Sequence, residues 1–206
     1  PFAFINKVKI LDPACGSGSF LIKAFDVLVE ECEKTCKRKL NYDEKKNLML
    51  NCIFGVDKDE RAVDICKLNL SLKLAQRGQK LPELHENIKC GDSLIDDKEI
   101  AGYKAFKWEV EFKDIITNGG FDVVIGNPPW GADFNFHEKE YFKNNFVSGK
   151  GIIDTFALFT ERGSLLLKKG GNFGFVLPDI ILLKNYPLIR KYILDNFTIS
   201  NIVYHG

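Results

Sequence analysis

The chain has 206 residues, 45% of them hydrophobic, which is enough apolar material for one substantial core and argues against a disordered tail or a minimal module. Its 29 basic and 28 acidic side chains nearly cancel, so charge alone gives no sign of a polyanionic partner, and a role with nucleic acid has to be argued from motifs. The six cysteines form no C-x-x-C pair and the histidines do not cluster, which argues against a metal site and favours reduced thiols.

The start of the chain and its hydropathy point away from membranes and export. No run of 18 apolar residues occurs, and no basic region at Pro1 leads into a signal-peptide core. We therefore expect a cytoplasmic protein with no membrane partner. Because the first residue is not methionine and an apolar strand is predicted a few residues in, we also expect a piece of a longer polypeptide.

Short apolar runs recur along the chain and most are followed by helical patterns, which is typical of a parallel sheet covered by helices. The predicted fold class is therefore α/β, with a mostly parallel sheet and helices on both faces. Strands are predicted at residues 8–11, 53–56, 88–90, 121–125, 173–177 and 199–204. Helices are predicted at residues 20–31, 60–75, 155–168 (ended by Gly170-Gly171) and 188–196.

The segment 30–46 is rich in lysine and other charged residues. We interpret it as a solvated helix end and loop. A phosphate-contacting edge is the alternative.

Polar residues follow each of the first four predicted strands. Asp12, Asp57, Asp92 and Asn127 stand just past the carboxyl ends of their apolar runs. Open parallel sheets bind ligands at that edge, because the loops that leave all the strands meet there. One acidic residue at a strand end is more often a helix cap, but three in sequence beside a glycine-rich loop predict a ligand site.

That loop, residues 12–20 (Asp-Pro-Ala-Cys-Gly-Ser-Gly-Ser-Phe), lies between a strand and a helix. Gly16 and Gly18 would let the backbone approach a ligand closely. The third glycine of a dinucleotide fingerprint and the Gly-Lys-Ser/Thr of a triphosphate loop are both missing, and acidic strand ends would repel phosphates. A cationic ligand rich in hydroxyl and amino donors, such as S-adenosylmethionine, fits better. Asp57 would take its ribose hydroxyls and Asp92 its adenine amino group.

The most specific signal is the tetrapeptide Asn127-Pro128-Pro129-Trp130. A tight proline turn with a packed tryptophan would explain it structurally. The chemical reading is that two carbonyl oxygens, from the Asn127 side chain and the Pro128 backbone, accept the two N–H groups of an aromatic amine and localise its lone pair. Trp130 would then stack on the base, which has to leave a duplex to reach such a pocket.

Together these motifs resemble the amino-methyltransferases of bacterial DNA restriction-modification systems. They follow the gamma arrangement, in which the cofactor motif precedes the Asn-Pro-Pro motif. Residues 106–112, ahead of 120–125, are also similar to the fused restriction-and-methylation and phage-exclusion members, and we predict no mechanistic role for that stretch. The resemblance implies methyl transfer from S-adenosylmethionine to N6 of a flipped adenine in double-stranded DNA. It implies catalytic roles for Asn127, Pro128, Pro129 and Trp130, and cofactor contacts from Asp12, Ala14, Cys15, Gly16, Gly18, Phe20, Asp57, Lys58, Asp92, Ser93 and Asn127.

The resemblance also implies a seven-stranded sheet and a recognition domain elsewhere in the full-length chain. Residues 1–206 would then be one catalytic core, with the last, antiparallel strand missing. We therefore expect residues from about Ile199 onward to be poorly ordered, displaced or docked on a neighbouring molecule rather than to form a central strand.

Two rival functions remain. An Asn-Pro-Pro enzyme of the same chemistry could act on protein glutamine or on RNA. A catalytically inactive module could bind DNA or scaffold a complex, although the intact Asp57, Asp92, Asn127 and Trp130 argue against decay.

Overall fold

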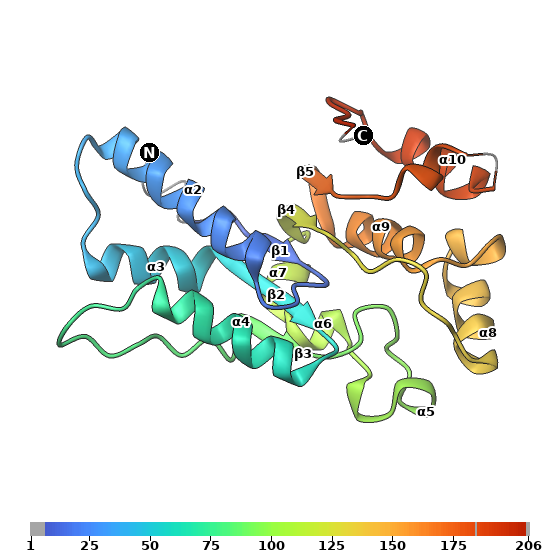
Figure 1. The fold of residues 1–206 in the computed structure, drawn as a ribbon, viewed down its shortest axis with the longest axis horizontal. Helices are drawn as coiled ribbons and strands as arrows, with labels where there is room; N and C mark the ends of the chain where they lie inside the picture. The colour runs from blue at the N-terminus through green and yellow to red at the C-terminus, as the bar shows by residue number, and fades with distance from the viewer. Residues whose placement is uncertain (1–6, 184, 205–206) are drawn as a thin grey trace.

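The computed structural model describes residues 7–183 and 185–204. Residues 1–6, on which the expectation that no signal peptide is present depends, lie outside the described part. The described residues form a five-stranded, fully parallel sheet (Figure 1) in the order β3-β2-β1-β4-β5. The strands are β1 (Ile10–Asp12), β2 (Ile53–Asp57), β3 (Ile88–Cys90), β4 (Phe121–Gly126) and β5 (Leu167–Phe175). The predicted α/β fold class is confirmed.

The order of the strands reverses at β1. The chain runs from β1 outward through β2 to β3, and then crosses back to place β4 on the other side of β1. Leu11 of β1 pairs with both Phe54 of β2 and Val124 of β4. The carboxyl ends of β1 and β4 therefore flank the point at which open α/β sheets bind their ligands.

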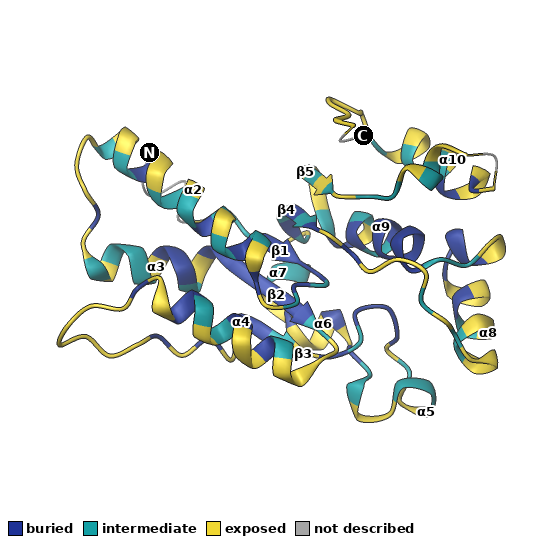
Figure 2. Ribbon diagram, viewed as in Figure 1, coloured by how far each residue is buried: buried dark blue, intermediate teal, exposed yellow. Residues whose placement is uncertain are grey.

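Helices cover both faces of the sheet because alternate strand residues point to opposite sides. Ile10 packs into one cluster and Leu11 into another. Figure 2 shows β1 and β2 buried between the helical layers, whereas β5 at the edge of the sheet is partly exposed. The first layer contains α2 (Ser19–Cys36), α3 (Tyr42–Cys52) and α4 (Glu60–Leu72); the second contains α6 (Trp108–Glu111), α7 (Lys113–Thr117) and α9 (Thr155–Leu166).

The remaining elements lie at the C-terminal side of the molecule and in the β3–β4 connection (Figure 1). Phe142 and Phe146, from α8 and its end, pack against α9, and Ile189 of α10 packs against Phe156 of α9. These elements are α5 (Lys98–Ala101), α8 (Phe136–Asn145), α10 (Pro187–Asn196) and the 3-10 turns Gly102–Lys104, Ser148–Lys150 and Asp179–Leu182. In the described part of the chain, no helix has the length and apolarity needed to cross a membrane.

The lysine-rich segment 30–46 contains a helix end and a loop, as predicted, but α3 begins within it. Most of its cations are exposed, and several pair with nearby carboxylates, for example Lys39 with Glu33 at 2.6 Å and Arg38 with Glu44 at 2.6 Å. Because these charges are matched locally, the solvated-surface interpretation holds better than a phosphate-contacting edge.

The predicted boundary between the helix at 155–168 and the strand at 173–177 is wrong. The helix ends at Leu166, and β5 begins at Leu167. The Gly170-Gly171 pair lies inside the strand, where the register with β4 shifts and Gly170 adopts a φ of 79°. These glycines therefore permit an irregularity in the strand instead of ending the helix.

The strand predicted at 199–204 does not form. Ile202 is 70% exposed and Val203 64% exposed, and both lie outside the sheet. Among the described strands β5 pairs with β4 alone, so nothing bridges the sheet to these residues. This agrees with the expectation that they would be displaced, because an isolated strand leaves its amide and carbonyl groups unpaired.

Candidate active site

The turn after β1 is held against β2 by its backbone. The Cys15 amide donates to the Val56 carbonyl at 3.0 Å, and the Gly18 amide donates to the Cys15 carbonyl at 2.8 Å. Gly18 has a φ of 89°, and a Cβ there would lie 2.6 Å from Cys66 Sγ, so only glycine fits. In the described structure α2 starts after Gly18 without a side-chain cap, which leaves the amides of its first turn to bind an anionic group of a ligand.

The turn after β2 is bonded directly to the glycine-rich loop. Asp57 Oδ2 accepts from the Gly16 amide at 2.8 Å, and Asp57 Oδ1 accepts from the Asp59 amide at 2.9 Å. A carboxylate has about four acceptor positions, so Asp57, which is half-buried, can still accept from a hydroxyl. Gly16 and Asp57, predicted separately, therefore lie together at the carboxyl edge of the sheet.

The turn after β3 is tied to the turn after β1. The Ser93 hydroxyl donates to the Pro13 carbonyl at 2.6 Å in a buried environment. Asp92 Oδ1 accepts from the Leu94 amide at 3.0 Å, and burial raises the pKa of Asp92 above its ordinary value. Its carboxyl is thus fixed in direction and partly desolvated, which suits recognition of a neutral amino group.

The stretch 106–112, which had no predicted role, packs under this turn. Phe106, Trp108 and Phe112 are buried and form one aromatic cluster with Phe54 and Phe121. The indole N–H of Trp108 donates to the Ser93 carbonyl at 3.0 Å. The stretch therefore supports the turn that carries Asp92 and Ser93.

Asp12, the last residue of β1, lies between the glycine-rich loop and the end of β4. It is 2% exposed, and its Oδ1 accepts from the Ala14 amide at 3.0 Å. Burial is the main cause that raises the pKa of Asp12 to about 7. The hydrogen bond from the Ala14 amide lowers this pKa, and the nearby charge of Asp57 raises it by a smaller amount. A Cβ on Gly126, the last residue of β4, would lie 2.7 Å from Asp12 Oδ1. The absence of a side chain at Gly126 lets the end of β4 approach the buried carboxyl.

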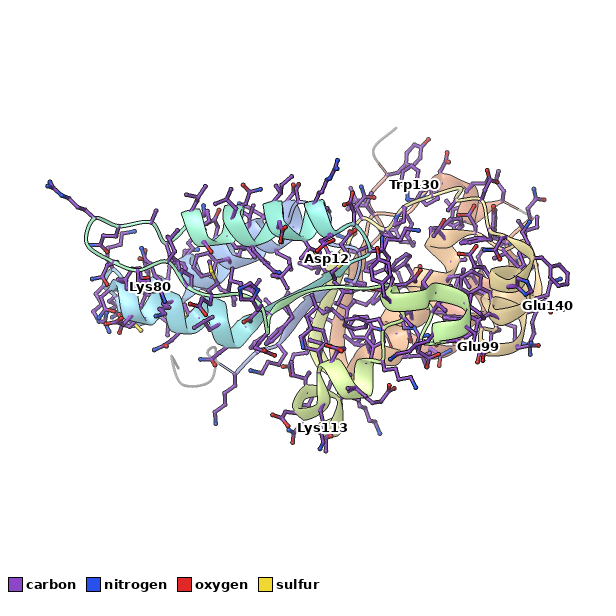
Figure 3. All side chains as sticks on the ribbon, turned by 90° about the horizontal axis from the view of Figure 1, so that it is seen from below. Asp12, Lys80, Glu99, Lys113, Trp130 and Glu140 are labelled. Carbon is purple, nitrogen blue, oxygen red and sulfur yellow. The ribbon has the colours of Figure 1, made fainter. Side chains whose placement is uncertain are left out.

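The tetrapeptide follows Gly126 directly. Pro128 is buried, whereas Asn127 and Pro129 are exposed and Trp130 is 52% exposed. Figure 3 labels Asp12 near the middle of the molecule and Trp130 on its C-terminal side. The turn thus presents the amide and the indole to solvent while one proline anchors it to the protein.

A cavity of about 450 Å³ lies beside these turns. It brings together Lys58 and Asp92, two of the predicted residues, but Asp57 and the glycine-rich loop are not in its lining. The lining also includes Asp59, Ile100, Ala101, Lys104 and Glu138, none of which was predicted. Of these, Asp59 and Glu138 carried a sequence signal. Asp59 is the N-cap directly before α4, and Glu138 closes an Asn-x-x-Glu capping box at the start of α8.

The fold is shared with solved restriction-modification enzymes and methyltransferases. A nuclease-deletion mutant of the Type ISP enzyme LlaGI, in complex with a DNA substrate mimic, matches 93% of this chain and 17% of that chain with a TM-score of 0.67 and 15% identity. The DrdV-DNA complex matches 93% of this chain and 19% of that chain, with a TM-score of 0.66 and 20% identity. A putative class I S-adenosylmethionine-dependent methyltransferase from Listeria monocytogenes matches 91% of this chain and 45% of that chain, with a TM-score of 0.53 and 21% identity. The chain therefore has the fold of the S-adenosylmethionine-dependent methyltransferases.

Sequence comparison identifies the family within this fold to which the chain belongs. Residues 51–206 match the Eco57I restriction-modification methylase family, and the chain belongs to that family. It is 31% identical to the type II restriction enzyme and methyltransferase RM.Eco57I of Escherichia coli, over 96% of this chain and 22% of that protein. It is 26% identical to the type II methyltransferase M.VspI of Vibrio sp., over 96% of this chain and 38% of that protein. The chain thus spans between about a fifth and two fifths of these relatives.

Proposed function

We propose that residues 1–206 form the catalytic core of an adenine-specific DNA methyltransferase of a restriction-modification or phage-defence enzyme. The reaction is transfer of a methyl group from S-adenosylmethionine to N6 of an adenine flipped out of double-stranded DNA. The observation that carries the proposal is the contact between Asp12 and Gly126. It joins the glycine-rich loop to the Asn-Pro-Pro-Trp turn at the place where this fold binds ligands.

The residues present suit S-adenosylmethionine. The uncapped first turn of α2 would bind its carboxylate, and the Asp57 carboxylate its ribose hydroxyls. Asp92 and the adjoining cavity would receive its adenine. When bound, S-adenosylmethionine supplies an electrophilic methyl group. Ala14, Cys15, Phe20, Lys58 and Ser93 would complete the site.

The Asn-Pro-Pro-Trp turn would act on the second substrate. The adenine amino group is a poor nucleophile because its lone pair is delocalised into the ring. Acceptance of its two N–H groups by the Asn127 side-chain oxygen and the Pro128 carbonyl would favour tetrahedral geometry as positive charge develops on nitrogen. Pro129 keeps the turn stiff, and Trp130 offers a face for stacking worth roughly 1 to 3 kcal/mol. Target recognition we assign to a domain elsewhere in the full-length protein.

The test is incorporation of labelled methyl groups from S-adenosylmethionine, with the full-length protein and equal masses of DNA, RNA and protein as acceptors. We expect label in DNA, at N6 of adenine after nuclease digestion, and none above background with Asn127→Ala. Label in RNA or in protein glutamine would support the rival enzyme. Calorimetric titration with S-adenosylmethionine, with Asp57→Asn as control, tests the cofactor separately, and no binding by the wild type would support the inactive module.

A further inference from the structure

The first turn of α9 contacts the backbone directly after the Asn-Pro-Pro-Trp turn. Asp154 Oδ1 accepts from the Gly131 amide at 3.1 Å. Thr155 Oγ1 accepts from the Ala132 amide at 3.2 Å. These are the first two amides that follow Trp130, so side chains from more than 20 residues away fix the exit of the turn.

The acceptors are themselves held firmly. Asp154 caps α9 through the Phe156 amide at 3.4 Å, and its Oδ2 accepts from the Tyr186 hydroxyl at 3.2 Å. Burial, with the adjacent Asp154 as a further cause, raises the pKa of Tyr186, so that hydroxyl stays a donor at neutral pH. Thr155 is 4% exposed and lies in the first turn of a helix whose residues are mostly buried.

The entry of the turn is also fixed. The Val176 amide, just past β5, donates to the Gly126 carbonyl at 3.0 Å. Four residues, 127–130, thus span two bonded ends, with Gly131 in a left-handed conformation (φ 65°) at the exit. Because the Asn127 side chain and Trp130 are exposed, their orientation depends on these two ends and on the buried Pro128 between them rather than on packing of their own.

We propose that Thr155 and Asp154 are positioning residues for methyl transfer, which hold the exit of the Asn-Pro-Pro-Trp turn so that Asn127, Pro128 and Trp130 keep their places when the base enters. The proposal rests on the function proposed above. A preorganised acceptor pair contributes only while its geometry is kept, and displacement by about 1 Å can cost on the order of 100-fold in rate.

The experiment compares Thr155→Val, which removes the acceptor at nearly constant shape, with Thr155→Ser, which keeps it. Thr160→Val is the matched control, because the Thr160 hydroxyl is equally buried in α9 but donates only to the Phe156 carbonyl at 2.7 Å within the helix. Asp154→Ala and Asp154→Asn repeat the comparison at the neighbouring residue, since alanine removes the oxygen acceptor and asparagine retains one. If Thr155→Val does not fold, this second pair of variants tests the positioning role.

Three quantities are measured on the full-length protein. They are the single-turnover rate of DNA methylation at saturating cofactor, the Kd of S-adenosylmethionine, and the ¹⁹F resonance of 5-fluorotryptophan at position 130, assigned by its loss in Trp130→Phe. We expect a roughly 10- to 100-fold lower rate in Thr155→Val and Asp154→Ala, a changed Trp130 resonance, and a Kd within about twofold of wild type. Thr155→Ser and Thr160→Val should stay near wild type.

A wild-type rate and resonance in Thr155→Val would overturn the proposal, as would an equal loss in Thr160→Val or a loss confined to cofactor Kd. The Trp130 resonance separates this result from failure of the proposed function. If the wild type methylates no DNA, the proposed function fails, and the positioning role is then judged by whether Thr155→Val and Asp154→Ala change that resonance while Thr160→Val does not.

Discussion

The turns after β1, β2 and β3 differ from the turn after β4 in how they are held. The first three are bonded to one another, through the Gly16 amide to Asp57 and through the Ser93 hydroxyl to Pro13. The turn after β4 makes its described hydrogen bonds to the end of β5 and to α9 instead. The side that we propose for the cofactor is therefore held together by bonds between these turns, whereas the side that we propose for catalysis is exposed and is held from the C-terminal half. Substitutions on the first side should change binding, and those on the second should change rate.

The largest effect is expected from Asn127→Ala in the full-length enzyme. Loss of one preorganised contact to charge that develops in the transition state typically lowers the rate about 100- to 1000-fold. The Kd of S-adenosylmethionine should stay within about twofold, because the Asn127 amide acts on charge that develops only in the transition state. Methylation assays and calorimetry measure the two quantities, and wild-type turnover by this variant would refute the catalytic role.

On the cofactor side we expect the next largest effect from Gly91→Ala. A Cβ at Gly91 would lie 2.3 Å from Phe106 Cδ2, so the aromatic cluster or the turn has to move. Overpacking of this kind costs about 1 to 3 kcal/mol in the free energy of unfolding. Displacement of Asp92 should weaken cofactor binding as well.

Gly174→Ala in β5 is the matched control for that variant. A Cβ at Gly174 would meet only Ile125 Cγ2, at an ordinary 3.9 Å. Urea unfolding measures the free energy of unfolding of both variants, and calorimetry measures their cofactor binding. Equal free energies of unfolding would show that the turn after β3 can move to accommodate the added Cβ at little cost.

A smaller effect is expected from pH, which should change stability and cofactor affinity through the protonation of Asp12. Its pKa of about 7 lies above the ordinary value of 3.8, so the protonated form is favoured in the folded protein without ligand. This group therefore favours folding below about pH 4, and the contribution is lost as the pH rises toward 7. A cationic ligand favours the carboxylate, so binding should release a proton near neutral pH. Affinity should then fall, by at most about tenfold per pH unit, as the pH drops below 7.

Calorimetry in two buffers of different ionisation enthalpy measures that proton release directly. Asp12→Asn cannot titrate at this position and should bind with a flatter pH profile. If the variant keeps the wild-type slope between about pH 6 and about pH 8, the proton comes from another group.

The smallest effect is expected at Lys58. Its side chain lines the cavity but the residue is exposed, so solvent and salt screen its charge. We expect Lys58→Met to change the Kd of S-adenosylmethionine less than about threefold at physiological salt. A tenfold change would move Lys58 into the group of residues that hold the cofactor directly.

Sequence patterns predicted the four strands that lead into the site because these strands are short, apolar and followed by polar residues. They missed α3 and α8, whose exposed faces leave little apolar periodicity. Both helices begin with an Asn-x-x-Glu capping box, at Asn41 and at Asn135, and this local signal could have found them. The strand at 199–204 was predicted from a short apolar run, which does not tell whether a neighbouring strand is present to pair with it.

Sequence motifs pointed to the glycine-rich loop and the Asn-Pro-Pro-Trp turn because the residue types in them suit few other chemical uses, and the roles of these residues stay predictions. Sequence patterns missed residues that act through tertiary contacts. Trp108 supports the turn after β3, and Asp154 and Thr155 hold the turn after β4, yet each looks like an ordinary core or capping residue in sequence. Their partners are distant along the chain, and local patterns carry no information about such pairs.

The contact between Asp12 and Gly126 also limits how members of this family can recombine. A chimaera that takes its N-terminal strands from one parent and its catalytic turn from another inherits the two residues from different sources. Because Gly126 has no room for a side chain against Asp12, the graft succeeds only where the second parent also has glycine at this position, or where the first has a residue smaller than aspartate at the end of β1. Shuffled libraries with a crossover between β3 and β4 should therefore be enriched, among functional survivors, for matched pairs at these two positions.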